Sequence, residues 1–311
     1  TLSSSSAASD VYKRQVAYLT GDEAMLSIAQ DRSQDAHSVT ASRISRVPVE
    51  LVLQEHKIVK TETEPNRIEM LRHKHLPTLY EKSYFLPRSM SLRQMGKKSN
   101  HGLNYDEGYK TFALINEMSE KEAKSVVRLY KFKAYKGIDR WHRAIQEKLL
   151  KDRTLTNCFD RKCYFMEGWG PDLFKQAYAF IPQATVGDMV NEGLVKAMND
   201  GRGDFKPLQL LAQVHDSAEF QYLSDDLRAL ARVCIKIGND YMRPKCRYVS
   251  MVPNREEWEF PPTEREFYIE TDLKVGMSKG AMTDLPIYND VERMENALKA
   301  ALTDDNSNFT S

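Results

Sequence analysis

The sequence predicts a fold that combines many helices with a few antiparallel hairpins. Apolar residues recur at helical spacing through residues 119–153, which indicates a long helical region. Residues 154–165 and 208–222 each contain two strand-like runs around a polar turn, which is typical of a β-hairpin. No internal repeat is visible, so we expect one or two globular domains.

The composition is that of a globular protein and excludes several other classes. The 311 residues are 41% hydrophobic and 29% charged, and the net charge is only +1. No apolar run approaches the ~20 residues of a transmembrane helix, and no secretory signal opens the chain. Because four cysteines are too few for a disulfide framework, we expect reduced thiols in a cytoplasmic protein. These cysteines are Cys158, Cys163, Cys234 and Cys246.

Further elements are predicted before and after these regions. Asp35 stands where it can cap a helix within residues 31–60. Ser89 or Ser91 can cap a helix that carries Arg93 and Lys97. Other helical patterns occupy residues 22–30, 174–198 and 227–242, and residues 266–275 alternate like a strand.

The first fifteen residues look foreign to the rest of the sequence. Residues 1–9 are of low complexity, and residues 10–15, DVYKRQ, resemble the translation of a sequencing-adapter remnant. Segments of that origin are excluded from fold reasoning, so we expect the native sequence to resume near Val16. An ordinary polar tail is the alternative interpretation.

Charge is unevenly distributed along the chain. Residues 121–162 contain 13 Lys and Arg against 5 Asp and Glu, whereas residues 251–311 contain 6 against 13. A basic helical region suits a polyanionic partner such as nucleic acid. A solvated helix face would show the same pattern.

One candidate site lies on the helix predicted after Ser91. Arg93, Lys97, His101 and Tyr105 are spaced by four residues, so neighbours in this series share one broad helix face. Arg can clamp phosphate with two hydrogen bonds, Lys adds a point charge, and a ring can stack on a sugar or base. The segment therefore predicts a triphosphate-and-base site, with a solvated basic helix as the alternative.

Two other segments carry candidate site residues. His215 and Asp216 lie at the tip of the hairpin in residues 208–222, where a carboxylate can bind Mg²⁺ or simply close the turn. Gln183 and Thr185 follow Pro182 at a predicted helix start. An exposed Gln there can reach the edge of a nucleic-acid base, although a polar helix start is equally ordinary.

The first of these segments resembles a motif of family A, DNA polymerase I-type DNA polymerases, and most resembles phage-like members. The family's finger helix reads Arg-x-x-x-Lys-x-x-x-aromatic-Gly-x-x-Tyr. Arg93, Lys97, Gly102 and Tyr105 occupy the matching places, and His101 takes the place of the aromatic residue.

The other segments follow the order of the same family's C-terminal half. Residues 215–217 resemble its His-Asp-acid hairpin, and residues 182–185 its Pro-Gln-x-Thr segment. Residues 35–41 resemble its Asp-x-His-x-x-Thr-Ala helix, and residues 268–276 its last palm strand. The resemblance runs from about residue 16 to about residue 285.

The resemblance implies an α+β fold in which largely helical fingers are inserted into a palm with a small antiparallel sheet. Residues 16–30 would begin the palm, 31–170 would form the fingers, 171–290 the rest of the palm and 291–311 a tail. The palm sheet would lack one strand, and so we expect an exposed edge and reduced stability.

The resemblance also implies roles for the candidate residues. Arg93 and Lys97 would hold the triphosphate of a deoxynucleotide, His101 would pack on its sugar or base, and Tyr105 would border the nascent pair. The residues expected to touch primer–template DNA are Gln183, Thr185 and His215. The catalytic set would be Asp216, Lys97 and His215, with Asp216 binding Mg²⁺ while a primer 3′-hydroxyl attacks the α-phosphate in a two-metal reaction. Replication accessory proteins are possible further partners.

Three departures from the family pattern are visible. His101 replaces Phe or Tyr, and Ser217 replaces the usual Glu, although Glu219 lies two residues further on the same strand face. The family's other metal-binding aspartate belongs to an Asp-x-Ser-Gln segment, whose place is taken by the adapter-like residues. Because two-metal chemistry needs both carboxylates, we expect this chain to be inactive or nearly so.

Two other functions fit parts of the sequence. A non-catalytic DNA-binding module would use the basic residues 121–162 and bind duplex without nucleotide selectivity. A His–Asp metal hydrolase would need histidines to converge on Asp216. The candidates for that role are His37, His73, His75 and His101.

Overall fold

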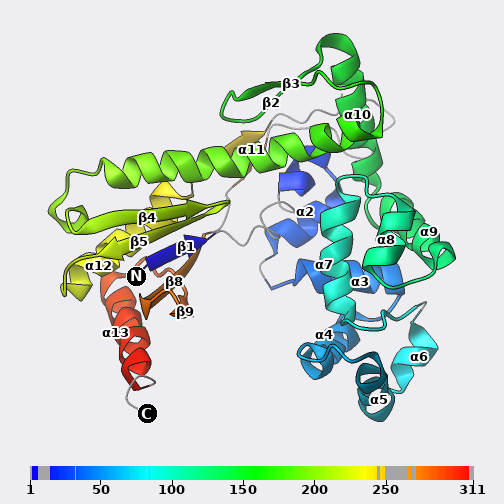
Figure 1. Ribbon diagram of the computed structural model, residues 1–311, viewed down its shortest axis with the longest axis horizontal. Coiled ribbons are helices and arrows are strands. Elements are labelled where there is room, and N and C mark those ends of the chain that lie inside the picture. Colours follow the sequence, from blue (N-terminus) through cyan, green and yellow to red (C-terminus); the bar gives the residue numbers. More distant parts are fainter. Residues whose placement is uncertain are drawn as a thin grey trace.

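The structure is a computed structural model that describes residues 2–5, 15–31, 33–83, 85–243, 246–248, 265–267 and 271–307. Figure 1 shows a cluster of helices on one side and an antiparallel sheet on the other, with the long helix α11 (Pro171–Met198) running between them. The predicted α+β fold is confirmed. No described helix is both long and apolar enough to span a membrane.

The helical part begins with a helical stretch at residues 15–20. The described residues that follow it form nine α-helices, a π-helical turn (η1) and one hairpin. Their bounds are α2 Glu23–Gln30, α3 Ala36–Ser45, α4 Val49–Val59, α5 Pro65–His75, α6 Thr78–Lys82, α7 Leu92–Leu103, α8 Tyr109–Ile115, α9 Glu120–Leu129, η1 Tyr130–Ala134, α10 Lys136–Asp152, β2 Thr154–Thr156 and β3 Lys162–Tyr164. The long helical region predicted at 119–153 is confirmed, and it is divided at Tyr135 into α9–η1 and α10. The hairpin predicted at 154–165 is confirmed.

The sheet part follows α11 in the chain. Its elements are η2 Gly203–Phe205, β4 Leu208–Val214, β5 Ser217–Tyr222, α12 Leu227–Lys236, η3 Ile237–Tyr241, β6 Cys246–Tyr248, β7 Arg265–Phe267, β8 Asp272–Ser278, β9 Ala281–Leu285 and α13 Val291–Ser307. Helix α13, in the region expected to be a tail, packs against α12, β8 and β9, with Met294 and Leu298 fully buried. Part of the strand expected at 266–275 lies outside the described residues.

The main sheet has the order β4-β5-β1-β8-β9, and each neighbouring pair is antiparallel. Strand β1 (Leu2–Ser5) lies between β5 and β8, with Ser5 paired to both Ser217 and Asp272. The expectation of an exposed edge at this position is wrong, because four residues of the excluded N-terminal segment fill it. Sheet hydrogen bonds use main-chain N–H and C=O groups, so a short strand of almost any sequence can pair there.

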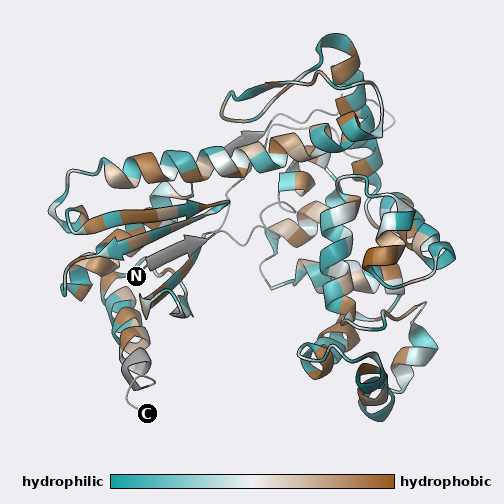
Figure 2. Ribbon diagram, in the orientation of Figure 1, coloured by the Kyte–Doolittle hydropathy of each residue, from teal (hydrophilic) through white to brown (hydrophobic). Residues whose placement is uncertain are grey.

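Helix α11 confirms the helical pattern predicted at 174–198, but the helix start predicted near Pro182 is wrong. The helix begins at Pro171 after Gly170, and Pro182 is buried within it. A proline in a helix interior removes one backbone hydrogen bond and costs about 3 kcal/mol. Apolar side chains buried on both sides of Pro182 offset that cost, and Figure 2 shows hydrophobic residues along the whole length of α11.

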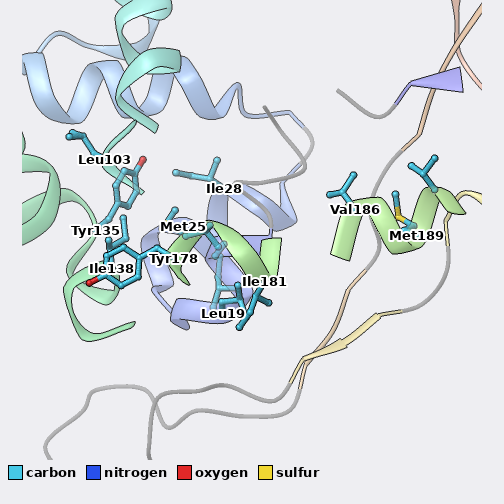
Figure 3. Close-up of a cluster of buried hydrophobic side chains, with 14 of the residues drawn as sticks. Leu19, Met25, Ile28, Leu103, Tyr135, Ile138, Tyr178, Ile181, Val186 and Met189 are labelled. Atoms are coloured by element: carbon cyan, nitrogen blue, oxygen red, sulfur yellow. The ribbon is translucent and has the colours of Figure 1, made fainter. Parts of the chain in front are cut away.

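The hydrophobic core joins α2 to α10 and α11. Figure 3 shows a cluster in which Met25 and Ile28 of α2 lie near Ile138 of α10 and Ile181 of α11, and Leu103 comes from the end of α7. Burial of such aliphatic side chains stabilises a fold by about 1.5–3 kcal/mol each. The core therefore fixes the position of α7 relative to α10 and α11.

Helices α3 and α7 pack with their backbones in close approach at Gly96. A Cβ atom at this position would lie 2.2 Å from the main-chain oxygen of His37 and 3.1 Å from the Cβ of Ala41. Only glycine leaves room for this contact without a shift of one helix. The glycine that precedes Lys97 is thus a packing requirement of the α3–α7 pair.

We expect Gly96→Ala to destabilise the protein by about 1–3 kcal/mol, because the overlap with the backbone of α3 exceeds the helix-propensity gain of about 1 kcal/mol. Gly187→Ala is the matched control, since a Cβ at this helical position meets nothing within 4 Å. The control should be neutral or slightly stabilised. Urea unfolding of both variants tests the packing, and equal stabilities would contradict it.

Candidate nucleotide and nucleic-acid site

Helix α7 presents the predicted series on its accessible side. Lys97 and His101 are exposed and Arg93 is half-buried, all on one side of the helix. The opposite side is buried through Leu92, Met95, Gly96, Ser99, Asn100 and Leu103. Ser91 caps the helix, because its hydroxyl accepts a hydrogen bond from the main-chain N–H of Gln94 at 3.1 Å. The predicted helix and its N-cap are confirmed.

A buried ion pair holds the N-terminus of α7. The Glu55 carboxylate of α4 accepts the Leu92 N–H at 2.9 Å and pairs with the Arg72 guanidinium of α5 at 2.5 Å. Arg72 also donates to the main-chain oxygens of Pro87 and Met90, in the segment that leads into the helix. Burial raises the pKa of Glu55, and Arg72 opposes that rise. Both ionised groups are therefore fully paired, which a buried ion pair needs in order to be tolerated.

Arg93 makes a two-point ion pair with Asp35 at the start of α3. Its Nε and Nη2 donate to the two carboxylate oxygens, each at 2.9 Å, and Asp35 also accepts from the Ser38 N–H at 2.9 Å. Burial alone would raise the pKa of Asp35, but the hydrogen bonds from Arg93 and Ser38 outweigh it and lower the pKa to about 2. A guanidinium has five N–H donors, so Arg93 keeps three for a further ligand.

The two rings of the predicted series lie together at the other end of α7. His101 and Tyr105 meet edge to face, with centroids 6.1 Å apart and an interplanar angle of 87°. Tyr105 lies just beyond the helix, in the turn after Leu103. A ligand that contacts Lys97 would thus meet the exposed ring of His101 one helical turn further along.

A buried polar network supports α7 from behind and was not predicted from the sequence. The Asn100 side-chain oxygen lies 3.0 Å from both the Thr40 and the Tyr130 hydroxyls, and the single Tyr130 hydroxyl hydrogen is shared with the Asn104 side-chain oxygen at 2.8 Å. The Nε2 of His142 lies 2.8 Å from the main-chain oxygen of Asn104 and is therefore the donor. Burial lowers the pKa of His142 to about 4, so the ring is neutral at pH 7. These contacts join α3, α7, η1 and α10.

The hairpin predicted at 208–222 is confirmed as β4–β5, and Figure 1 shows its tip directed toward the helical part. His215 is exposed at the turn and has a φ of 53°, and Asp216 is half-buried. The Ser217 hydroxyl donates to the Val214 oxygen at 2.8 Å, which closes the turn. Glu219 pairs with Lys279 at 2.7 Å, so its carboxylate is already engaged.

Helix α11 contacts the hairpin and carries the third predicted segment. Gln183 is exposed, and Gln213 of β4 donates to Asn191 of α11 at 3.0 Å. Thr185 has no exposed surface. The expectation that Thr185 contacts DNA is therefore wrong for this conformation, because its side chain belongs to the packed face of the helix.

The described residues do not assemble a metal centre. No group of three or more His, Cys, Asp or Glu side chains that could hold a metal ion occurs among them. His37 is buried on α3, and His73 stacks on Tyr80 with centroids 3.9 Å apart. A His–Asp hydrolase centre on Asp216 is therefore not supported in this part of the chain, and neither is a cluster for two Mg²⁺ ions.

The Asp35–Arg93 pair predicts a pH-dependent contribution to stability. Because the folded pKa of Asp35 lies below its ordinary value of 3.8, the contribution is complete above about pH 5 and is lost as the pH falls toward 2. Asp35→Asn keeps a capping oxygen for Ser38 but removes the charge. We expect this substitution to lower the free energy of unfolding by about 1–2 kcal/mol at pH 7, and by about half as much near pH 3. Urea unfolding at both pH values tests this, and a loss independent of pH would contradict it.

Comparisons with known proteins agree with the fold. Among solved structures, the chain is similar to the POL domain of Pol1 from M. smegmatis in complex with DNA primer-template and dNTP, at 18% identity and a TM-score of 0.56. That match covers 86% of this chain and 39% of the other, and at this identity it shows the fold alone.

A family comparison gives the more specific result. No curated protein matches the chain. The model of DNA polymerase family A matches residues 86–249, just over half of the chain, and this range includes α7, α11 and the β4–β5 hairpin. The chain belongs to DNA polymerase family A.

Proposed function

We propose that the chain is the fingers-and-palm part of a template-directed DNA polymerase. The observation that carries the proposal is the accessible side of α7, where Arg93, Lys97 and His101 follow one another within a family A domain. The fingers would comprise residues 31–170, which contain the helices from α3 to α10. The palm would comprise the β4–β5 hairpin with its neighbouring strands and α11.

The incoming deoxynucleotide would lie along α7. Lys97 is exposed and has no ion-pair partner among the described residues, so its ammonium group is available to the triphosphate. Arg93 would add its three remaining donors while Asp35 keeps the guanidinium oriented. His101 would pack on the sugar or base, and Tyr105 would border the nascent base pair.

Primer–template DNA would lie between α7 and the hairpin. His215 at the hairpin tip and Gln183 on α11 are both exposed and belong to elements in contact. The excess of Lys and Arg in residues 121–162 favours a polyanion on the helical side. The solved structure with the same fold holds primer-template DNA and dNTP, which supports these ligands for the present chain.

The carboxylates of the described residues do not fit the two-metal reaction of the family. Ser217 takes the place of an acid, Glu219 is paired with Lys279, and Leu2–Ser5 brings no carboxylate to the strand beside the hairpin. Asp216 belongs to no group of three or more candidate metal ligands among the described residues. We therefore propose that this chain binds nucleotide and DNA but does not extend a primer.

A non-catalytic DNA-binding module is the second candidate, and it is favoured because no cluster of three or more candidate metal ligands occurs among the described residues. The two candidates differ in nucleotide binding. A polymerase part selects deoxynucleoside triphosphates through α7, whereas a simple DNA-binding module has no use for Lys97.

We expect Lys97→Ala to weaken deoxynucleoside triphosphate binding about 10- to 100-fold, because a charge-assisted hydrogen bond contributes about 1.5–3 kcal/mol. Lys98→Ala is the matched control, since Lys98 turns away and donates to the main-chain oxygen of Ile115 at 2.9 Å. Titration calorimetry of both variants tests the site. Equal losses, or no binding by the unaltered chain, would favour the DNA-binding module.

We expect no primer extension by this chain with Mg²⁺ or Mn²⁺, even with protein in excess over primer–template. Denaturing gels of a labelled primer measure extension by a single nucleotide. The same preparation should bind primer–template in a mobility shift, which controls for folding. Extension that Asp216→Asn abolishes would overturn the proposed inactivity and would make Asp216 a catalytic residue.

A further inference from the structure

A second basic site lies on the helical part, at a groove between α3, α9 and η1. The groove has a volume of about 560 Å³ and is lined by Arg46, Ser125, Arg128, Leu129, Phe132 and Lys133. Arg46 comes from the end of α3, where it adopts a φ of 64°. The other five residues come from α9 and η1.

The groove is separate from the proposed nucleotide site. Asp35, at the start of α3, contacts Arg93 of α7, whereas Arg46 caps the other end of the same helix. Helix α3 has ten residues and is therefore about 15 Å long. A ligand in the groove would lie at the opposite end of α3 from the Arg93 side chain.

The positive charge of the groove is not neutralised by its own walls. Three of its six lining residues are cations and none is acidic. In the described part of the chain, Arg128 and Lys133 have no ion-pair partner, although neighbouring cations do: Lys131 pairs with Asp106, and Arg143 with Asp139. Arg128 and Lys133 thus lie where the surface is hollowed, and this arrangement favours an anionic ligand.

An exposed aromatic ring lies among these cations. Phe132 is 55% exposed, while its neighbours Tyr130 and Ala134 in η1 are buried. The π-helical turn therefore directs Phe132 outward, where an apolar ring gains nothing from the core. Aromatic rings beside phosphate-binding cations are the combination that binds unpaired bases, because every base offers a flat face for stacking.

We infer that this groove binds single-stranded DNA, with phosphates at Arg46, Arg128 and Lys133 and a base stacked on Phe132. A single strand suits the groove better than a duplex, whose base faces are hidden within the stack. The inference goes beyond the proposed function, because it concerns a site away from α7 and the hairpin. It needs neither bound nucleotide nor catalysis.

The charge test uses the full chain and a fluorescent (dT)₁₂ oligonucleotide without metal or nucleotide. We expect Arg128→Ala/Lys133→Ala to weaken binding about 10-fold or more at low salt. The salt dependence, log K against log [salt], should become shallower by about 1.4, since each phosphate contact with a single strand contributes about 0.7. Lys121→Ala/Lys151→Ala is the control, because it removes two exposed lysines of the same basic region outside the groove. Equal behaviour of the two double variants would overturn the inference.

The ring test separates a single strand from other polyanions. We expect Phe132→Leu to weaken (dT)₁₂ binding about fivefold or more, while Phe132→Tyr retains it, because stacking needs an aromatic face. An effect of the charge variant without an effect of Phe132→Leu would overturn the assignment to single-stranded DNA. Nucleotide titrations of the same variants should match the unaltered chain, so failure of the groove and failure of the α7 site are distinguishable.

Discussion

The arrangement of the candidate site depends on how α7 is held against α3. Gly96 removes the side chain that would separate the two helices, and a Cβ there would overlap the His37 oxygen at 2.2 Å. At the start of α7, the buried Glu55 accepts the Leu92 N–H and is itself neutralised by Arg72. The helix therefore has one permitted position. Its polar side, with Lys97 and His101, faces outward because its other side is packed against α3.

Electrostatics and packing act together at this helix. Arg93 is held by Asp35, which also caps α3, so one carboxylate joins the start of one helix to the first turn of the other. Behind α7, Asn100 and Asn104 bind hydroxyls from η1 and α3. Buried polar networks of this kind are costly when broken, because an unpaired group keeps its desolvation penalty. They make the position of α7 specific where apolar contacts alone would allow it to slide.

The sequence predicted what depends on local chemistry. Helical spacing, the Ser91 cap and the β4–β5 turn around His215 all follow from residues close together in the chain, and the structure confirms them. Long-range contacts were not predictable in the same way. The partnership of Asp35 with Arg93 spans 58 positions, and the buried face of Thr185 depends on what packs against α11. Neither has a local sequence signal.

Pro182 is a case in which a local sequence signal was present but gave the wrong prediction. Proline is a strong local signal for a helix start, and that signal was outweighed by apolar residues that continue on both sides of it. The groove at Arg128, Phe132 and Lys133 was not predicted from the sequence either. The sequence shows these residues as part of a basic helix, and the groove forms only because the end of α3 lies beside α9 and η1.

In the five-stranded sheet, the backbone and the side chains contribute different things. Strand β1 completes the ladder between β5 and β8 with Leu2–Ser5, because pairing needs only main-chain donors and acceptors. Chemistry at the hairpin tip needs particular side chains, and Ser5, paired with Ser217, is not a carboxylate. A sheet can thus be whole as a scaffold and still lack the acidic cluster that metal-dependent phosphoryl transfer requires. The proposed binding of nucleotide along α7 depends on a different set of contacts, centred on α3 and α4, and so can persist where catalysis does not.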